Sequence, residues 1–174
     1  MDDAAEHDAD HRPEQPAHHE QRPATNDAYS RLEPVTKINT VVPIPAPTAR
    51  AAILPFMDPA FAISICRYDL TAGPLKLSAP VSQAYTSVSF YTRYGAAYYA
   101  ITDRSAGRRV IELDLMTERQ HAQTPAEEGE TAADRLIVES PTTTGLIVIK
   151  ALSPEPSLMG MAERAVATAK CSPP

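Results

Sequence analysis

Short segments with apolar side chains at every second position recur between Phe61 and Ile149, and this alternation most restricts the fold. In the first segment, Phe61, Ile63 and Ile65 would lie on one face and Ala62, Ser64, Cys66 and Tyr68 on the other. A period of two is typical of a β-strand, because successive side chains point to opposite faces. The pattern therefore predicts a mainly β domain.

Similar segments follow along the chain at 74–80, 84–92, 96–102, 109–115, 134–140 and 145–152. Together with the first segment they predict six to seven short strands. The last is apolar on both faces from Leu146 to Ile149, which indicates a central strand. Thr92 to Gly95 has the length and the glycine of a hairpin loop. Strands joined by tight turns favour a β-sandwich or a jelly-roll-like sheet.

One C-terminal helix is expected over residues 153–170, with a cap at Ser153 or Ser157. Its apolar side chains repeat at helical spacing: Leu158, Met161, Ala162, Ala165, Val166 and Ala169. The polar stretch 117–134 is expected to form a surface excursion, with a capping box of Thr117 and Gln120 over one helical turn.

Three regions are expected along the 174 residues. Residues 1–24 contain no Val, Ile, Leu, Phe or Tyr, which predicts a disordered, acidic, histidine-rich tail. Residues 25–51 are expected to form an extended, proline-rich strap, opened by a helical turn capped by Thr25 or Asn26. The β-sandwich domain with its helix would then occupy residues 52–171.

The net charge of −6 lies almost wholly in the tail. Residues 1–24 hold seven acidic and two basic side chains, whereas the other 150 residues hold fifteen and fourteen. A domain this close to neutral has no basic face for a phosphate backbone, so we expect no nucleic-acid partner.

Four of the five histidines lie in the tail, at positions 7, 11, 18 and 19. The spacing of His7 and His11 would suit one metal ion on a helical face, but Pro13 and Pro16 interrupt a helix there. We therefore expect no physiological metal site and no cofactor, with a weak metal-binding tail as the alternative.

Six of the ten aromatic residues fall between positions 85 and 99, where they could form the wall of a ligand site. The candidate ligand-binding residues are Arg67, Asp69, Tyr91, Arg93, Tyr98, Asp103 and Arg104. In the alternative interpretation, the rings pack a sheet face and the charges solvate turns.

Catalysis is the less favoured hypothesis. Asp58, Asp69 and Asp103 could supply paired carboxylates, and His121 lies in the polar excursion, but no G-x-S-x-G elbow and no glycine-rich phosphate loop is present. No catalytic residue is assigned.

An ordered series of motifs from residue 58 to 107 resembles one known family. These are the DL-x-x-GPL turn, the YTSVSFY strand, the Tyr-Gly hairpin and the DRSAG turn, with ATAKC near the C-terminus. The series is similar to the bacterial domain-of-unknown-function family DUF1254 in its short form, over about residues 55–170. The resemblance implies a β-sandwich in the cell envelope, behind a membrane helix; it implies no activity.

No apolar run in this sequence has the length of a membrane span, and Met1-Asp2-Asp3 differs from the basic start of a signal peptide. We expect the chain as given to be soluble, and to meet a membrane only through an anchor outside this sequence. Its compartment is expected to be periplasmic or membrane-anchored, with a cytoplasmic protein as the alternative. Cys66 and Cys171 would pair in an oxidising compartment and tie the last helix to the sheet; two free thiols are the alternative.

The favoured hypothesis for function is a non-enzymatic envelope domain that interacts with a protein partner or an envelope component, or supports structure. The alternative is a small-ligand-binding domain or a hydrolase-type enzyme that uses the tyrosine-rich hairpin and its neighbouring Arg and Asp turns.

Overall fold

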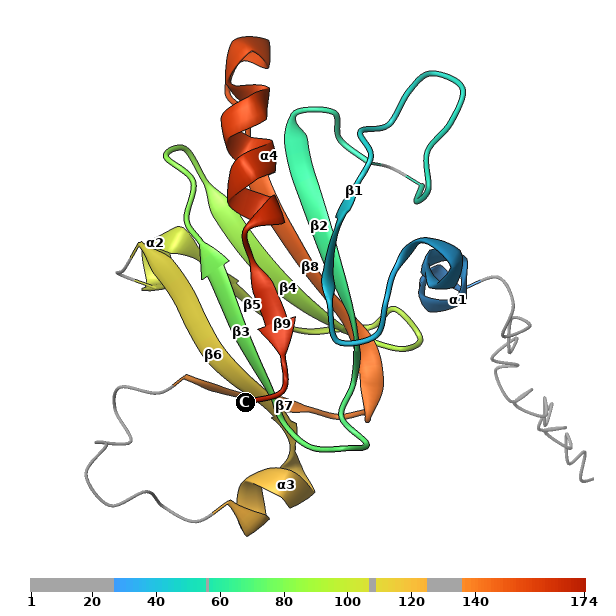
Figure 1. Cartoon of the computed structure of the whole chain (residues 1–174), viewed down its shortest axis with the longest axis vertical. Coiled ribbons are helices and arrows are strands. Elements are labelled where there is room, and N and C mark those ends of the chain that lie inside the picture. Colours follow the sequence, from blue (N-terminus) through green and yellow to red (C-terminus); the bar gives the residue numbers. More distant parts are fainter. Residues whose placement is uncertain (1–26, 56, 107–108, 125–135) are drawn as a thin grey trace, which may run out of the picture.

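The fold is known from a computed structural model, which describes residues 27–55, 57–106, 109–124 and 136–174. The predicted tail 1–24 with its histidines, and the predicted caps Thr25 and Asn26, lie outside the described residues. Within the described residues nine strands form two sheets, which confirms the expected mainly β, two-layered fold (Figure 1).

Sheet A has five antiparallel strands in the order β1 (Val41–Ile44), β2 (Phe61–Asp69), β8 (Thr144–Leu152), β4 (Thr86–Thr92) and β5 (Ala97–Thr102). Sheet B has four, in the order β7 (Ile137–Ser140), β6 (Val110–Thr117), β3 (Leu75–Pro80) and β9 (Lys170–Ser172), with only β6 and β7 parallel. The helices are α1 (Ala28–Leu32), α2 (Asp103–Ala106), α3 (Glu118–Gln123) and α4 (Met159–Ala167).

The predicted central strand is confirmed, because β8 pairs with β2 on one side and with β4 on the other. Its apolar run from Leu146 to Ile149 is therefore covered on both faces of sheet A. The alternation in β2 separates the same two faces. Ile63 and Ile65 belong to one buried cluster, and Cys66 and Tyr68 to the other.

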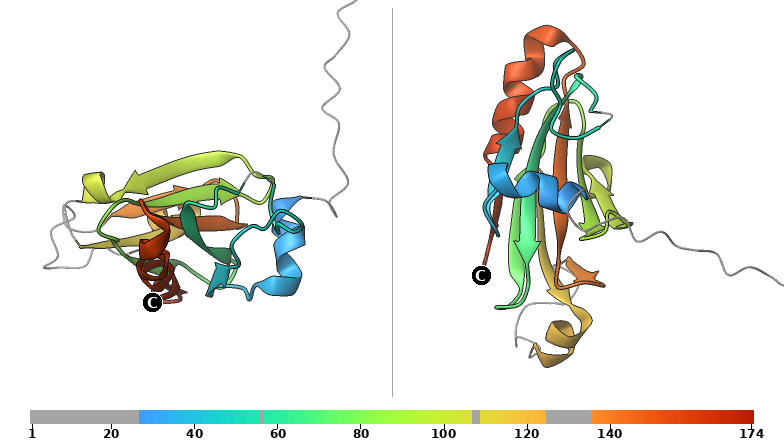
Figure 2. Two further views of the ribbon diagram at one scale, coloured as in Figure 1. Left: turned by 90° about the horizontal axis from the view of Figure 1, so that it is seen from above. Right: turned by 90° about the vertical axis from the view of Figure 1, so that its right-hand side faces the viewer.

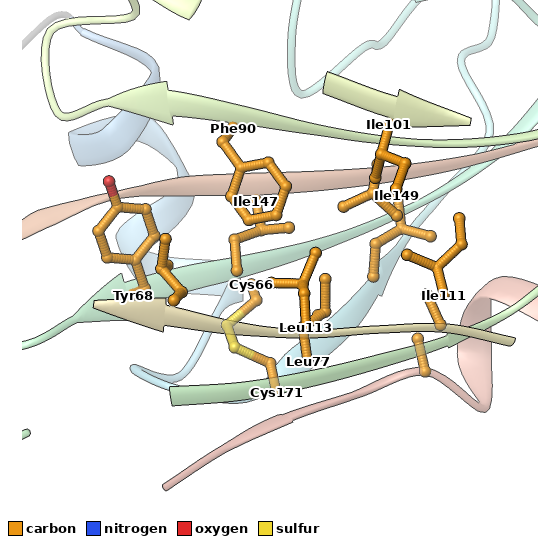
Figure 3. Packing of buried hydrophobic residues seen from close by; sticks show 14 of the residues in the cluster. Cys66, Tyr68, Leu77, Phe90, Ile101, Ile111, Leu113, Ile147, Ile149 and Cys171 are labelled. Carbon is orange, nitrogen blue, oxygen red and sulfur yellow. A yellow bond between two sulfur atoms is a disulfide. The ribbon is translucent and has the colours of Figure 1, made fainter. Parts of the chain in front are cut away.

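The main core fills the space between the two sheets. Side chains of sheet A such as Phe90 and Ile147 meet side chains of sheet B such as Leu77 and Leu113 (Figure 3). Helix α4 extends beyond the strands at the top of Figure 1, and it buries Ala162 and Val166 in the same cluster.

A disulfide between Cys66 and Cys171 crosses this core (Figure 3). Cys66 lies in β2 of sheet A and Cys171 in β9 of sheet B, so the bond joins the two layers. The expected link to the last helix is wrong in this detail, because the residues around Cys171 form a strand beside β3.

The outer face of sheet A carries a second, smaller core. Ile63, Ile65 and Leu146 pack there against Tyr29 and Leu32 of α1, with residues 53, 54 and 57 at the margin. In Figure 1, α1 and sheet B accordingly lie on opposite sides of β2. Sheet A is thus covered on both faces.

Part of the segment expected as a proline-rich strap belongs to sheet A. Strand β1 pairs with β2 from Val41 to Ile44, so part of the proline-rich strap is an edge strand of sheet A. Pro43 is tolerated there because an edge strand has one side on which no backbone N–H is needed. The helical turn expected next to the strap is confirmed as α1, and its cap is Asp27, whose carboxylate accepts a hydrogen bond from the Ser30 N–H.

The C-terminal helix is shorter than expected. It begins at Met159 with neither predicted serine as its cap, because the Ser153 hydroxyl donates to the Glu155 carbonyl instead. It ends at Ala167, where the Thr168 hydroxyl donates to carbonyls of the last turn, and Lys170 to Ser172 pair with β3. The helical spacing of apolar residues continues to Ala169, so the sequence cannot show that the chain leaves the helix at Ala167 and pairs with β3.

The capping box of Thr117 and Gln120 is confirmed at α3. The Gln120 side chain accepts from the Thr117 N–H and also donates to the Leu70 carbonyl at 2.7 Å. This second bond ties the short α3 to the turn that follows β2.

Figure 2 shows the thin, layered shape that results, with α1 outside the sheets. None of the helices in the described ranges is both long and apolar enough to span a bilayer.

Replacing Gly145 with alanine is expected to destabilise the fold. A methyl group there would collide with the Tyr91 carbonyl oxygen and the Tyr68 hydroxyl, and a backbone carbonyl in a sheet cannot move aside cheaply. We expect Gly145→Ala to lower the free energy of unfolding by about 3 kcal/mol, measured by urea denaturation. Gly160→Ala in α4 is the control, because its methyl would have only the Arg164 Nη1 within reach, at 3.5 Å, and should be neutral or stabilising. Equal effects of the two substitutions would contradict this packing.

Candidate functional site

The candidate ligand-binding residues do not form one site. Arg67 and Asp69 lie at the end of β2, and Arg93 lies in the turn between β4 and β5. Asp103 and Arg104 lie in α2, at the opposite end of β5 from that turn. Tyr91 and Tyr98 are divided as well, since Tyr91 packs against the outer core of sheet A and Tyr98 against the inner one.

Arg67 and Arg93 are nevertheless brought together by a residue that sequence reasoning missed. The Tyr29 ring of α1 contacts both of them, with the guanidinium carbons of Arg67 and Arg93 at 4.9 and 5.2 Å from its centroid. Both distances are within the range of a cation–π contact. We call Tyr29, Arg67 and Arg93 the arginine clamp. The spacing of Tyr29 and Leu32 is the signal that could have found it, because it indicates one buried face of a short helix. It does not indicate which residues that face packs against.

Arg67 is the most unusual member of the clamp, because a charged residue with only 6% of its surface exposed needs compensation. Its Nη1 lies 3.7 Å from a Glu33 carboxylate oxygen, and its Nε has no hydrogen-bond partner among the residues that the structure describes. The Tyr29 ring face and the Glu33 charge therefore carry most of that compensation. Burial raises the pKa of Tyr29, and the two nearby guanidinium groups oppose the rise.

Asp69 stands beside the clamp but is occupied locally. One of its carboxylate oxygens accepts from both the N–H and the hydroxyl of Thr71, which makes a turn after β2. Its backbone exchanges two hydrogen bonds with the Asn39 side-chain amide. These contacts fix the turn and the strap; no described contact makes Asp69 part of a carboxylate pair.

Tyr98 belongs to a buried chain of hydroxyl groups at the end of the sandwich. The Tyr68 hydroxyl lies 3.1 Å from the Tyr98 hydroxyl and 2.9 Å from the Ser140 hydroxyl, which donates to the Thr142 carbonyl at 2.6 Å. Because Ser140 gives its one proton to Thr142, it accepts from Tyr68, which in turn accepts from Tyr98. The Tyr91 carbonyl is a second acceptor near the Tyr68 hydroxyl, at 3.3 Å. The chain joins β5 and β2 of sheet A to β7 of sheet B.

A bulge aims the Tyr98 ring inward. The β4–β5 register passes from Phe90 opposite Tyr99 to Tyr91 opposite Ala97, so Tyr98 is the extra residue. Tyr98 and Tyr99 consequently both lie against Phe90, with ring centroids 6.1 and 5.8 Å away. This confirms neither a ligand wall nor an exposed aromatic face, since both rings serve the core.

At the far end of β5, Asp103 accepts a hydrogen bond from the Thr86 N–H at 3.2 Å, which holds the start of α2 to β4. Arg104 is exposed. His121 pairs with Glu139 at 2.6 Å on the surface. Within the described ranges, no three His, Cys, Asp or Glu side chains form a group that could hold a metal ion; His7 and His11 lie outside them.

A cavity of about 330 Å³ lies between α4, β1 and the start of β2. Its wall is apolar except for Glu163, and it includes Ile44, Phe61, Met57, Met159 and Val166. Sequence analysis missed it, because it forms only where the strap meets α4. None of the predicted site residues lines it.

One protein family matches most of this chain. The family described as "Protein of unknown function (DUF1254)" matches residues 38–173. The chain belongs to the DUF1254 family. The match begins after α1, so Tyr29 and Glu33 lie before the part of the chain that the family model matches, whereas Arg67 and Arg93 lie within it.

One solved structure supports the fold of this DUF1254 domain. The VPA0106 protein from Vibrio parahaemolyticus is similar with a TM-score of 0.57 at 12% identity, over 83% of this chain and 34% of that one. A putative uncharacterized protein from Burkholderia cenocepacia gives a TM-score of 0.47 at 12% identity, over 75% of this chain and 37% of the other. The DUF1254 chain thus spans about a third of each protein. A search of curated proteins found no match.

The arginine clamp predicts different effects for two substitutions of Tyr29. Tyr29→Phe keeps an aromatic ring in contact with both guanidinium groups, whereas Tyr29→Leu keeps apolar volume without a ring. We expect Tyr29→Leu to lower the free energy of unfolding by about 1–2 kcal/mol more than Tyr29→Phe, measured by urea denaturation. Repeating both in an Arg67→Met background should reduce the difference; an unchanged difference would show that the rings do not act through Arg67.

The hydroxyl chain predicts a dependence of stability on alkaline pH. Burial raises the pKa of Tyr98 above its ordinary value of 10.0. The unfolded chain ionises Tyr98 near that pH while the folded protein keeps it protonated, so its contribution is full below pH 10 and is lost as the pH rises toward the folded pKa. Tyr98→Phe should therefore show a shallower fall in unfolding free energy above that pH. Tyr94→Phe, at the most exposed tyrosine, is the control, and equal slopes for Tyr98→Phe and the unmodified protein would contradict the prediction.

Proposed function

We propose that this DUF1254 domain is a non-catalytic interaction or structural module of the cell envelope. The observation that carries the proposal is the buried disulfide between β2 and β9. Cys66 and Cys171 are 0% and 4% exposed, and their Cα atoms are 6.4 Å apart, within the usual range for a disulfide.

The disulfide supports an oxidising compartment, because cytosolic thiols are kept reduced and structural disulfides persist mainly outside the cytosol. It also has a structural use here. A thin domain with two cores gains stability when its two sheets are joined across 105 positions of sequence.

The polar clusters support a non-catalytic role, since their groups are used by the chain itself. The Tyr29 ring contacts both arginines of the clamp, and Thr71 donates to the Asp69 carboxylate. The Asn39 side chain bonds the Asp69 backbone, and the Tyr98 hydroxyl begins a chain that ends at the Thr142 carbonyl. These contacts hold α1, the strap and β7 in place.

The alternative of a ligand site or hydrolase at the tyrosine-rich hairpin finds less support. Asp103 and Arg104 are separated from Arg67 and Arg93 by the length of β5. The residues proposed to converge on one ligand therefore lie at two different ends of β5.

The disulfide is tested by intact mass under non-reducing conditions. Protein directed to an oxidising compartment should be lighter by two hydrogen atoms than the same protein after reduction. Its free energy of unfolding should exceed that of the Cys66→Ser, Cys171→Ser double variant by about 4 kcal/mol, as expected for so long a loop. Reduced protein is the control and should match the double variant.

Two results would contradict the proposal. One is a pair of free thiols in protein recovered from the oxidising compartment. The other is recovery of the natural protein, carried in its native cell, in the cytosolic fraction.

A further inference from the structure

The two sheets have four edge strands, and three of them are protected against pairing with another chain. Strand β1 contains Pro43, β7 has only four residues and exposes Glu139, and β9 has three residues and exposes Lys170. Proline, short length and charge are the usual means by which an edge strand avoids another strand.

Strand β5 lacks proline, charge and very short length; a β-bulge, which also protects an edge strand, affects only its first half. Its sequence, AYYAIT, contains no proline and no charged side chain over six residues. In the described parts of the chain its strand partner is β4, which leaves one side of its backbone without a strand. The bulge at Tyr98 disturbs the first half of the strand, but Tyr99 to Thr102 keep regular pairing.

The register shows which backbone groups of β5 face the open side. The Leu152 N–H donates to the Tyr85 carbonyl on the β8 side of β4, and the Thr92 N–H donates to the Ala96 carbonyl on the β5 side. Hydrogen bonding alternates along an antiparallel strand, so Val88 and Phe90 bond to β5, through Ile101 and Tyr99 opposite them. Ala100 then directs its N–H and carbonyl away from β4, and its side chain is exposed.

We propose that β5 is a dimerisation edge that pairs in antiparallel fashion with β5 of a second copy of this chain. The two-fold axis passes through Ala100, so that the two Ala100 residues exchange both outward backbone hydrogen bonds. The five strands of sheet A then continue into the five of the second copy.

A second copy fits this edge because β5 is complementary to itself. About a two-fold axis at Ala100, Tyr99 lies opposite Ile101 of the other copy, and an aromatic ring beside a β-branched side chain is a favourable cross-strand pair. No charged residue of the strand meets its own kind. Because β5 has no charged side chain, it cannot select a different chain by charge complementarity.

The turns that flank β5 extend the contact. Tyr94 is 81% exposed, the most exposed large hydrophobic residue in the described chain, and it lies in the turn before β5. Antiparallel pairing brings that turn to the end of the second β5, where Arg104 is exposed. The Tyr94 ring of one copy and the Arg104 guanidinium of the other can then form a cation–π contact, once at each end of the paired strands.

Two substitutions at Ala100 separate edge pairing from folding. Ala100→Pro removes the outward N–H and leaves the bonds to β4, whereas Ala100→Thr retains the N–H and suits a strand. The full chain should sediment as a dimer at high concentration and dissociate on dilution. Ala100→Thr should behave likewise, and Ala100→Pro should sediment as a monomer with an unchanged far-ultraviolet circular dichroism spectrum.

A charge pair provides the second test, which holds even if Ala100→Pro fails to fold. Ala100→Lys and Ala100→Glu should each dimerise at least tenfold more weakly than the unmodified chain, because each places two like charges at the axis. Mixing the two variants should restore dimers that contain one of each, and added salt should weaken them.

The pairing stands independently of the compartment and of the proposed envelope function. An unmodified chain that stays monomeric at every concentration overturns it. So does a mixture of the Lys and Glu variants that forms no more dimer than either alone, which would place the contact away from Ala100 or with a different chain.

Discussion

The burial of sheet A on both faces is the constraint on which the rest of the structure depends. Strands β2 and β8 carry apolar side chains on both sides, so a single partner layer would leave one side in water. Sheet B covers the inner face, and α1 with its following segment covers the outer one. The proline-rich segment is therefore part of the folded unit, and the family match begins within it, at residue 38.

The polar groups that looked most like a binding site are a consequence of this double cover. Covering the outer face buries Arg67, and Tyr29 enters with α1 to supply the ring face that offsets loss of water. Closing the end of the sandwich buries the Tyr68 hydroxyl, which Tyr98 and Ser140 satisfy. Both clusters follow the rule that a buried polar group needs a partner.

Strand β5 shows how one element can serve opposite requirements. Along its edge toward β4, a bulge lets both Tyr98 and Tyr99 pack against Phe90 of the core. Around Ile101 the pairing of β5 with β4 is regular. On its other side, the regular half from Tyr99 to Thr102 has neither proline nor charge, in contrast to the other three edges. The other edge strands of the domain are protected, and this contrast is why we assign an interaction to β5. Pairing between strands uses backbone hydrogen bonds and requires no pocket.

Local periodicity by itself determined the class of the fold, seven of its strands, the central place of Leu146 to Ile149 and the capping box at Thr117, because each depends on neighbours within a few residues. Only the tertiary structure decided that β1 and β9 are strands, that Cys171 meets Cys66, and that the Tyr29 ring contacts two arginines. These are contacts between segments far apart in the chain. A pattern can show that a segment has an apolar face, but the surface that covers this face is chosen by the packing of the whole molecule.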